Sequence, residues 1–120
     1  AERFLRLRYN ELCLGTYDGM EIVGFKNQLS HSYGDNPHPF LTMQTGTGIH
    51  PAVRAEGYHT AGFFATYLIG PLLPLNPPFA ASLIRRMLPE YVDAPLPYEM
   101  EAYRRRVAQL RDPAVNTRFH

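Results

Sequence analysis

The sequence has little of several features that would define a protein class. It contains one cysteine, Cys13, so no disulfide can form within the chain. No stretch resembles a secretory signal or reaches the length of a membrane-spanning helix, about 20 apolar residues. Arg3, Arg6 and Arg8 interrupt the apolar residues at the start of the chain. We therefore expect a cytoplasmic protein with no membrane partner.

The chain also has no large excess of positive or negative charge. The 120 residues carry 12 Lys and Arg against 11 Asp and Glu, a formal net charge of +1, and the basic residues are spread along the chain. Without a polybasic block, we expect no nucleic-acid partner. The length and the 45% hydrophobic content suit one globular domain or part of a larger one. Because the chain begins with strand-like alternation and no initiator Met, we also expect sequence upstream of it.

Strand patterns dominate the first half of the chain. Residues Leu5 to Leu14 alternate at first and then become apolar, and Met20 to Phe25 resumes β-type residues. Between them Asp18-Gly19 tolerates positive φ, so the two strands are predicted to pair as an antiparallel hairpin. A third strand is predicted over Phe40 to Gln44, after a loop that is dense in Gly, Asn, Asp and Pro.

The second half has one long apolar run and two helical patterns. Ala61 to Ile69 is apolar on both faces, which is typical of a doubly buried strand, and we predict that it lies at the centre of a sheet. A helix is predicted to begin at Pro77 with Asn76 as its N-cap. A second helix is predicted over Tyr98 to Arg111, and residues 112–120 are expected to form a frayed tail.

Four short segments stand in an order that is more specific than any one of them. They are G-F-x-N (Gly24–Asn27), G-T-G (Gly46–Gly48), E-G (Glu56-Gly57) and T-Y-L-I-G-P-L-L-P-L-N-P (Thr66–Pro77). This order resembles the C-terminal half of the cobyric-acid-synthase-like class I glutamine amidotransferases, including the forms that serve as the glutaminase subunit of lipid II isoglutaminyl synthase. The resemblance covers roughly Arg8 to Leu88.

The resemblance implies a fold and a chemistry. The fold is α/β, part of a class I glutamine amidotransferase-like sandwich with a mixed sheet, an antiparallel hairpin and C-terminal helices. Residues 1–91 would be the C-terminal part of that domain, and residues 92–120 a linker and C-terminal helix with its tail. In the chemistry, a cysteine thiolate attacks the glutamine amide, a histidine moves the protons and ammonia goes to an acceptor. No cofactor is expected, and no pair of histidines has the spacing of a metal motif.

The matching positions of this sequence do not hold the groups that react in the family. The family histidine stands in T-Y-L-H-G-P, and the matching residue here is Ile69, which can neither accept nor donate a proton. Cys13 lies in an apolar stretch without a strand-to-helix nucleophile elbow, so we interpret it as a buried structural thiol. His59 is interpreted as a loop histidine, not as a relocated base. The chain alone is therefore predicted to be inactive as a glutaminase.

Candidate substrate-binding residues come from Gly24 to His31, which matches the family's G-F-E-N-H-x-x-R segment. Asn27 is kept, Lys26 replaces Glu, Gln28 replaces His, and His31 replaces Arg. Asn27, Gln28 and His31 are therefore predicted to border the glutamine pocket.

Three functional hypotheses fit these observations. The chain is part of a glutamine amidotransferase domain whose cysteine half lies elsewhere, or a non-catalytic domain that serves as a scaffold or regulatory partner, or an independent binding module with an α/β topology. The first two predict an exposed apolar sheet edge or face. The partner covering it would be the missing amidotransferase half, a ligase or synthase subunit, or a second copy of the chain.

Overall fold

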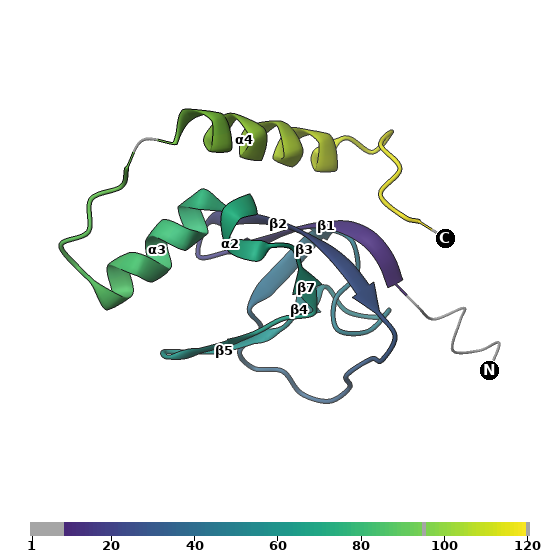
Figure 1. The fold of residues 1–120 in the computed structure, drawn as a ribbon. Coiled ribbons are helices and arrows are strands. Elements are labelled where there is room, and N and C mark those ends of the chain that lie inside the picture. Colours follow the sequence, from purple (N-terminus) through teal and green to yellow (C-terminus); the bar gives the residue numbers. More distant parts are fainter. Residues whose placement is uncertain (1–8, 95, 120) are drawn as a thin grey trace.

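The computed structural model describes residues 9–94 and 96–119 (Figure 1). Its strands are β1 (Tyr9–Tyr17), β2 (Met20–Gln28), β3 (Leu41–Thr45), β4 (Ala55–Glu56), β5 (Tyr58–Thr60), β6 (Phe63–Ala65) and β7 (Leu68–Ile69). Its helices are α2 (Leu72–Leu75), α3 (Pro77–Met87) and α4 (Pro97–Arg111). The start of the first predicted strand, with its arginines, lies outside the described residues.

Five strands form one sheet in the order β4-β3-β1-β2-β7, and every pairing given for it is antiparallel. The chain is thus α/β in content, but the described residues form an antiparallel sheet where a mixed one was expected. The β1–β2 hairpin is confirmed, with its turn at Asp18 (φ 48°) and Gly19 (φ 75°). Positive φ at both turn positions matches the right-handed twist of the paired strands.

The prediction of one central strand over Ala61 to Ile69 is wrong. The run divides into β6, which pairs with β5 in a separate two-stranded hairpin, and β7, which lies at the edge of the larger sheet beside β2. Thr66 and Tyr67 separate the two strands because both bond to the Glu56 carboxylate instead of continuing a ladder. As a result Phe63 and Ile69 are 56% and 53% exposed.

The strands that are buried on both faces are β1 and β2. On one face a cluster of aliphatic residues packs under α4: Leu14, Val23, Val107 and Leu110. On the other face a larger cluster packs against α3 and the β5–β6 hairpin: Cys13, Tyr17, Ile22, Phe40, Leu41, Met43, Leu68 and Phe79, with Phe64 and Leu83 beside them. Figure 1 shows α4 on one side of the sheet and the hairpin on the other. Each large apolar side chain buried here stabilises the fold by roughly 1.5–3 kcal/mol.

Both predicted helices are confirmed, and Asn76 is the N-cap residue of α3, but the expected side-chain capping bond is not made. Its side chain makes no capping bond to α3 and is instead fully buried against β2. Asn76 Oδ1 accepts from the Val23 N–H (2.7 Å), and Asn76 Nδ2 donates to the Val23 carbonyl (2.8 Å). The residue therefore ties the start of α3 to the centre of the sheet. No helix in the described part of the chain has the length and apolar character needed to cross a membrane.

The expectation of a frayed tail is also wrong. The Leu12 N–H donates to the Thr117 carbonyl (2.8 Å), and the Phe119 N–H donates to the Asn10 carbonyl (2.7 Å). β3 pairs with β1 only from Leu14 to Thr16, so the first half of β1 leaves backbone groups for residues 117–119 to bond. The tail thus extends the sheet, because backbone groups at a sheet edge favour a pairing strand.

Candidate functional site

A buried ion pair lies at the centre of the molecule. Lys26 Nζ donates to the carbonyls of Thr47 (2.7 Å) and Gly48 (3.1 Å) and lies 3.7 Å from Glu56 Oε1. Both charged side chains are 0% exposed. Charges removed from water in this way need further hydrogen bonds, and the two loop carbonyls supply them to the ammonium group.

The carboxylate of Glu56 joins the two edges of the sheet. It accepts hydrogen bonds from the Thr66 hydroxyl (2.6 Å) and from the Tyr67 N–H (2.8 Å). Glu56 belongs to β4 at one edge, whereas Tyr67 directly precedes β7 at the other. These bonds therefore curl the antiparallel sheet so that its opposite edges approach each other.

This buried polar framework contains residues from each of the four segments that carry the family resemblance. Lys26, Thr47 with Gly48, Glu56, and Thr66 with Tyr67 come from the four segments in turn. Asn76, near the end of the fourth segment, binds β2 separately.

Two glycines of these segments are required by close packing. A Cβ on Gly48 would lie 2.4 Å from the backbone oxygens of Val53 and Ala55. A Cβ on Gly24 would lie 2.7 Å from the side chain of Leu68, where β2 meets β7. The four segments thus act together as structural residues.

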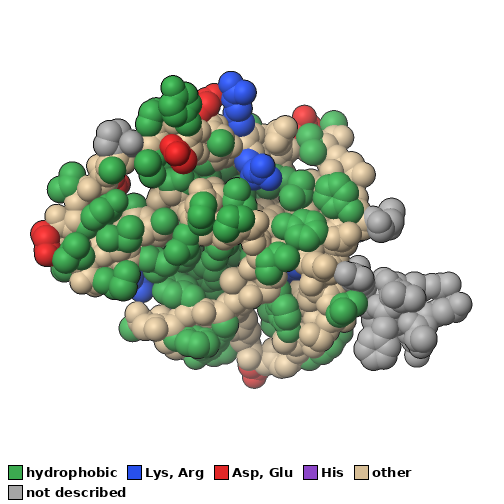
Figure 2. Space-filling model, viewed as in Figure 1, with side chains coloured by type: hydrophobic (Ala, Val, Ile, Leu, Met, Phe, Trp, Pro, Cys, Tyr) green, Lys and Arg blue, Asp and Glu red, His purple; other side chains and the backbone are tan. Residues whose placement is uncertain are grey.

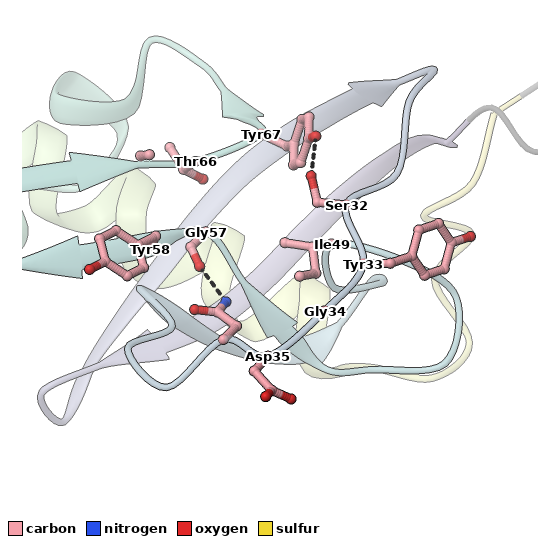
Figure 3. A pocket seen from close by; sticks show the side chains of 11 residues that line it. Ser32, Tyr33, Gly34, Asp35, Ile49, Gly57, Tyr58, Thr66 and Tyr67 are labelled. Carbon is pink, nitrogen blue, oxygen red and sulfur yellow. Dashed lines mark hydrogen bonds between the residues drawn. The ribbon is translucent and has the colours of Figure 1, made fainter.

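A cavity of about 440 Å³ opens beside the framework (Figure 3). Its walls are the loop of residues 32–36, Ile49, and residues 57–58 and 65–67 on either side of the β5–β6 hairpin. Since Thr66 and Tyr67 also bond to Glu56, the framework holds one wall of the cavity in place.

The polar groups of the cavity are mostly uncharged. Ser32 Oγ and the Tyr67 hydroxyl lie 2.9 Å apart, and Asn36 Nδ2 donates to the Gly57 carbonyl (2.8 Å), as Figure 3 shows. Asp35 contributes the one carboxylate among the lining residues, and no thiol or imidazole lines the cavity. Hydroxyl and amide groups suit a ligand that both donates and accepts hydrogen bonds. They do not provide a nucleophile with a base.

The lining of this cavity includes none of the three predicted substrate-binding residues. Gln28 is buried, and its Nε2 donates to the carbonyls of Ser30 (2.8 Å) and Ile49 (3.0 Å). His31 Nδ1 lies 3.4 Å from the same nitrogen, whereas the side chain of Asn27 is exposed on β2. Gln28 and His31 are therefore brought together at the base of the loop that forms the wall.

The lining residues that sequence reasoning missed are concentrated in that loop. Ser32, Asp35 and Asn36 stand in H-S-Y-G-D-N-P, and all three are common turn residues. Tyr67 was counted as part of an apolar strand, although its hydroxyl was the signal that could have singled it out. Tyr33, which also lines the cavity, stacks on the His50 ring with 4.6 Å between the ring centroids.

Ile69 does not line this cavity. It pairs with Phe25 at the sheet edge, so the expectation that it lies on a strand at the centre of the sheet is wrong. His59, expected in a loop, lies in β5, with its Nδ1 3.0 Å from the carbonyl of Pro39. The position that the resemblance assigns to proton transfer is thus aliphatic and apart from the polar cavity.

Cys13 is a buried thiol, as the sequence predicts. Its side chain is 0% exposed, and its Sγ lies 3.8 Å from the Glu11 carbonyl. Burial and the Glu11 carboxylate raise the pKa of Cys13 to about 12, although Lys26 acts in the opposite direction. Because the thiolate is the reactive form, this sulfur is not a nucleophile near neutral pH.

The described residues hold no group of three or more His, Cys, Asp or Glu side chains that could bind a metal ion.

In comparisons with known proteins, no family model matches the sequence and no curated protein matches it.

Proposed function

We propose that the chain is part of a glutamine amidotransferase-like domain that lacks the reacting groups and binds a small amide-bearing ligand without hydrolysing it. The observation that carries the proposal is the buried polar framework, in which Lys26, Glu56 and Tyr67 join segments that resemble the family. These contacts give the four segments a structural role, and that role does not require catalysis.

Two side chains explain why we propose that the chain does not hydrolyse the amide. Amide hydrolysis by this family's chemistry needs a thiolate to attack the carbonyl and an acid to protonate the leaving ammonia. Cys13 is a buried thiol with a pKa of about 12, and the residue in the histidine position is Ile69. Cys13 therefore does not supply the thiolate, and Ile69 does not supply the proton.

The cavity supports the choice of ligand. In the Ser32–Tyr67 pair one hydroxyl donates to the other, so one O–H and several lone pairs remain to meet an amide, which has both donors and acceptors. The carboxylate of Asp35 suits the ammonium group of an amino acid. A volume of about 440 Å³ lies within the range of small-molecule sites, about 300–1,000 Å³. Glutamine has the amide and the ammonium group together.

The alternative function, a scaffold or regulatory module, is favoured by β7. This strand lies at the edge of the sheet, and Ile69 on it is about half exposed. An edge strand with unpaired backbone groups accepts a strand from another chain. The partner would be an amidotransferase half, a ligase or synthase subunit, or a second copy of this chain.

Titration of the ¹⁵N-labelled chain with glutamine tests the proposed function. We expect amide shifts at residues 32–36 and 65–67, and Tyr67→Phe should weaken binding about 2- to 12-fold, the equivalent of one neutral hydrogen bond. Tyr98→Phe, a matched change at a tyrosine that is 86% exposed and outside the cavity, should leave binding unchanged. An unchanged spectrum, together with self-association that Ile69→Lys disperses, would favour the scaffold function.

A further inference from the structure

Two other hollows share a pair of polar side chains that the proposed function does not use. Hollows of about 400 and 480 Å³ are both lined by His59 of β5 and by Arg86 near the end of α3. His38 and Thr60 complete the first, and Tyr17 lies in the second. On the face drawn in Figure 2, hydrophobic side chains line a recess between α3 and the β5–β6 hairpin, and a basic side chain lies at its edge.

Arg86 is held in place by neutral groups. Its Nη2 donates to the Tyr17 hydroxyl (2.6 Å), its Nη1 lies 3.4 Å from the Ala61 carbonyl, and its guanidinium carbon lies 5.5 Å from the centre of the Phe64 ring. A cation over an aromatic face is oriented without losing its charge.

Within the described residues Arg86 makes no ion pair with a carboxylate. Its neighbour Arg85 does make one, with 2.5 Å between Arg85 Nη1 and Asp93 Oδ1. Arg86 is therefore a positioned cation whose charge is not neutralised by the protein, and guanidinium N–H groups remain for a ligand.

His59 is oriented by the same aromatic cluster. Because a carbonyl oxygen can only accept, the 3.0 Å contact with Pro39 places a proton on His59 Nδ1 and leaves Nε2 for another partner. The ring stacks on Phe64 at 5.8 Å with 15° between the planes and meets the edge of Tyr17 at 5.4 Å. Phe64 thus contacts both polar side chains and brings them together.

We propose that this Arg86–His59 site binds the phosphate group of a small phosphate monoester. The free N–H groups of Arg86 meet the anionic oxygens, since a guanidinium matches phosphate geometry. His59 Nε2 bonds to another phosphate oxygen through a proton that either the imidazole or the phosphate carries.

The surroundings limit the rest of the ligand. Thr60 and His38 offer further hydrogen bonds in the first hollow. The second hollow presents the aromatic rings of Tyr17 and Phe40, with the Asp18 carboxylate also in its lining. The Asp18 carboxylate would repel a second anionic group in this hollow. The organic part of the proposed ligand is therefore uncharged and apolar. Phenyl phosphate has this combination and is the probe of choice.

The test is an NMR titration of the whole chain with phenyl phosphate in phosphate-free buffer. We expect shifts at residues 59–61 and Arg86 and none at Ser32 to Asn36, which separates this site from the amide cavity. Arg86→Gln should weaken binding at least tenfold, because a charge-assisted hydrogen bond is lost. Arg85→Gln removes the same charge one residue away and should change binding less than twofold.

A second variant protects the test against a folding defect. His59→Gln removes the imidazole while Arg86 is retained, and should weaken binding at least threefold if the ring bonds to phosphate. Unshifted amide signals of Tyr9 to Leu14, which lie outside both hollows, confirm that each variant is folded. The proposal is overturned if phenyl phosphate shifts no resonance of the site. Equal weakening by Arg85→Gln and Arg86→Gln, which indicates charge alone, or full binding by His59→Gln also overturns it.

Discussion

Replacing Lys26 by Met is expected to lower the free energy of unfolding by about 3–5 kcal/mol, the cost of leaving one member of a buried ion pair without its partner. The Glu56 carboxylate would stay 0% exposed with only Thr66 and Tyr67 as donors, and the Thr47 and Gly48 carbonyls would lose the ammonium group. A domain of this kind is stable by only about 5–15 kcal/mol, so much of its stability would be lost. Urea unfolding followed by circular dichroism measures the change.

Two control variants make this result specific to the buried pair. Lys26→Met combined with Glu56→Gln removes the unpaired charge, so the double variant should be more stable than Lys26→Met alone. Arg105→Met breaks the exposed pair with Glu101 and should leave the urea midpoint nearly unchanged. A loss below about 1 kcal/mol for Lys26→Met would mean that water reaches the ammonium group, contrary to the framework described here.

Cys13 is expected to resist thiol reagents as long as the chain is folded. Its pKa is raised from 9.0 to about 12, mainly by burial, so at neutral pH its thiolate fraction falls by about a thousandfold. Burial of the sulfur slows the reaction further. Reaction with 5,5′-dithiobis(2-nitrobenzoate) at pH 7.5, followed in buffer and in urea, should be at least a thousandfold slower in the folded chain.

The same shift predicts how stability depends on alkaline pH. Because the folded state favours the protonated thiol, the contribution of Cys13 is fully present below pH 9.0 and is lost as the pH rises towards about 12. Cys13→Ala should lose this part of the pH dependence. Modification of the native thiol at a rate close to that of the unfolded chain would show that Cys13 is accessible and ionisable.

The local signals in the sequence predicted local structure well. Asp18-Gly19 specified the turn of the first hairpin because few other residue pairs accept positive φ at both positions. The apolar spacing of Tyr98 to Arg111 predicted α4 to within one residue of its start. Cys13 was correctly interpreted as buried because its neighbours are apolar.

The failures share a cause, which is bonding between residues far apart in the sequence. Nothing near Ala61 to Ile69 reveals that Glu56 bonds to Thr66 and Tyr67 and divides the apolar run. Asn76 is the N-cap residue of α3, yet its side chain bonds to the backbone of β2 and makes no capping bond. The candidate cavity was missed for the same reason, because its walls come from four separate segments.

The central claim is the proposal that this chain resembles a glutamine amidotransferase domain but does not catalyse the reaction, and release of glutamate from glutamine tests it most directly. The assay uses the purified chain, with Cys13→Ala, which lacks the sulfur, as the matched control. The account predicts that both release glutamate only at the rate of buffer, because the folded chain has neither a thiolate nor a proton donor at Ile69. Glutamate release above buffer that disappears in Cys13→Ala would contradict it.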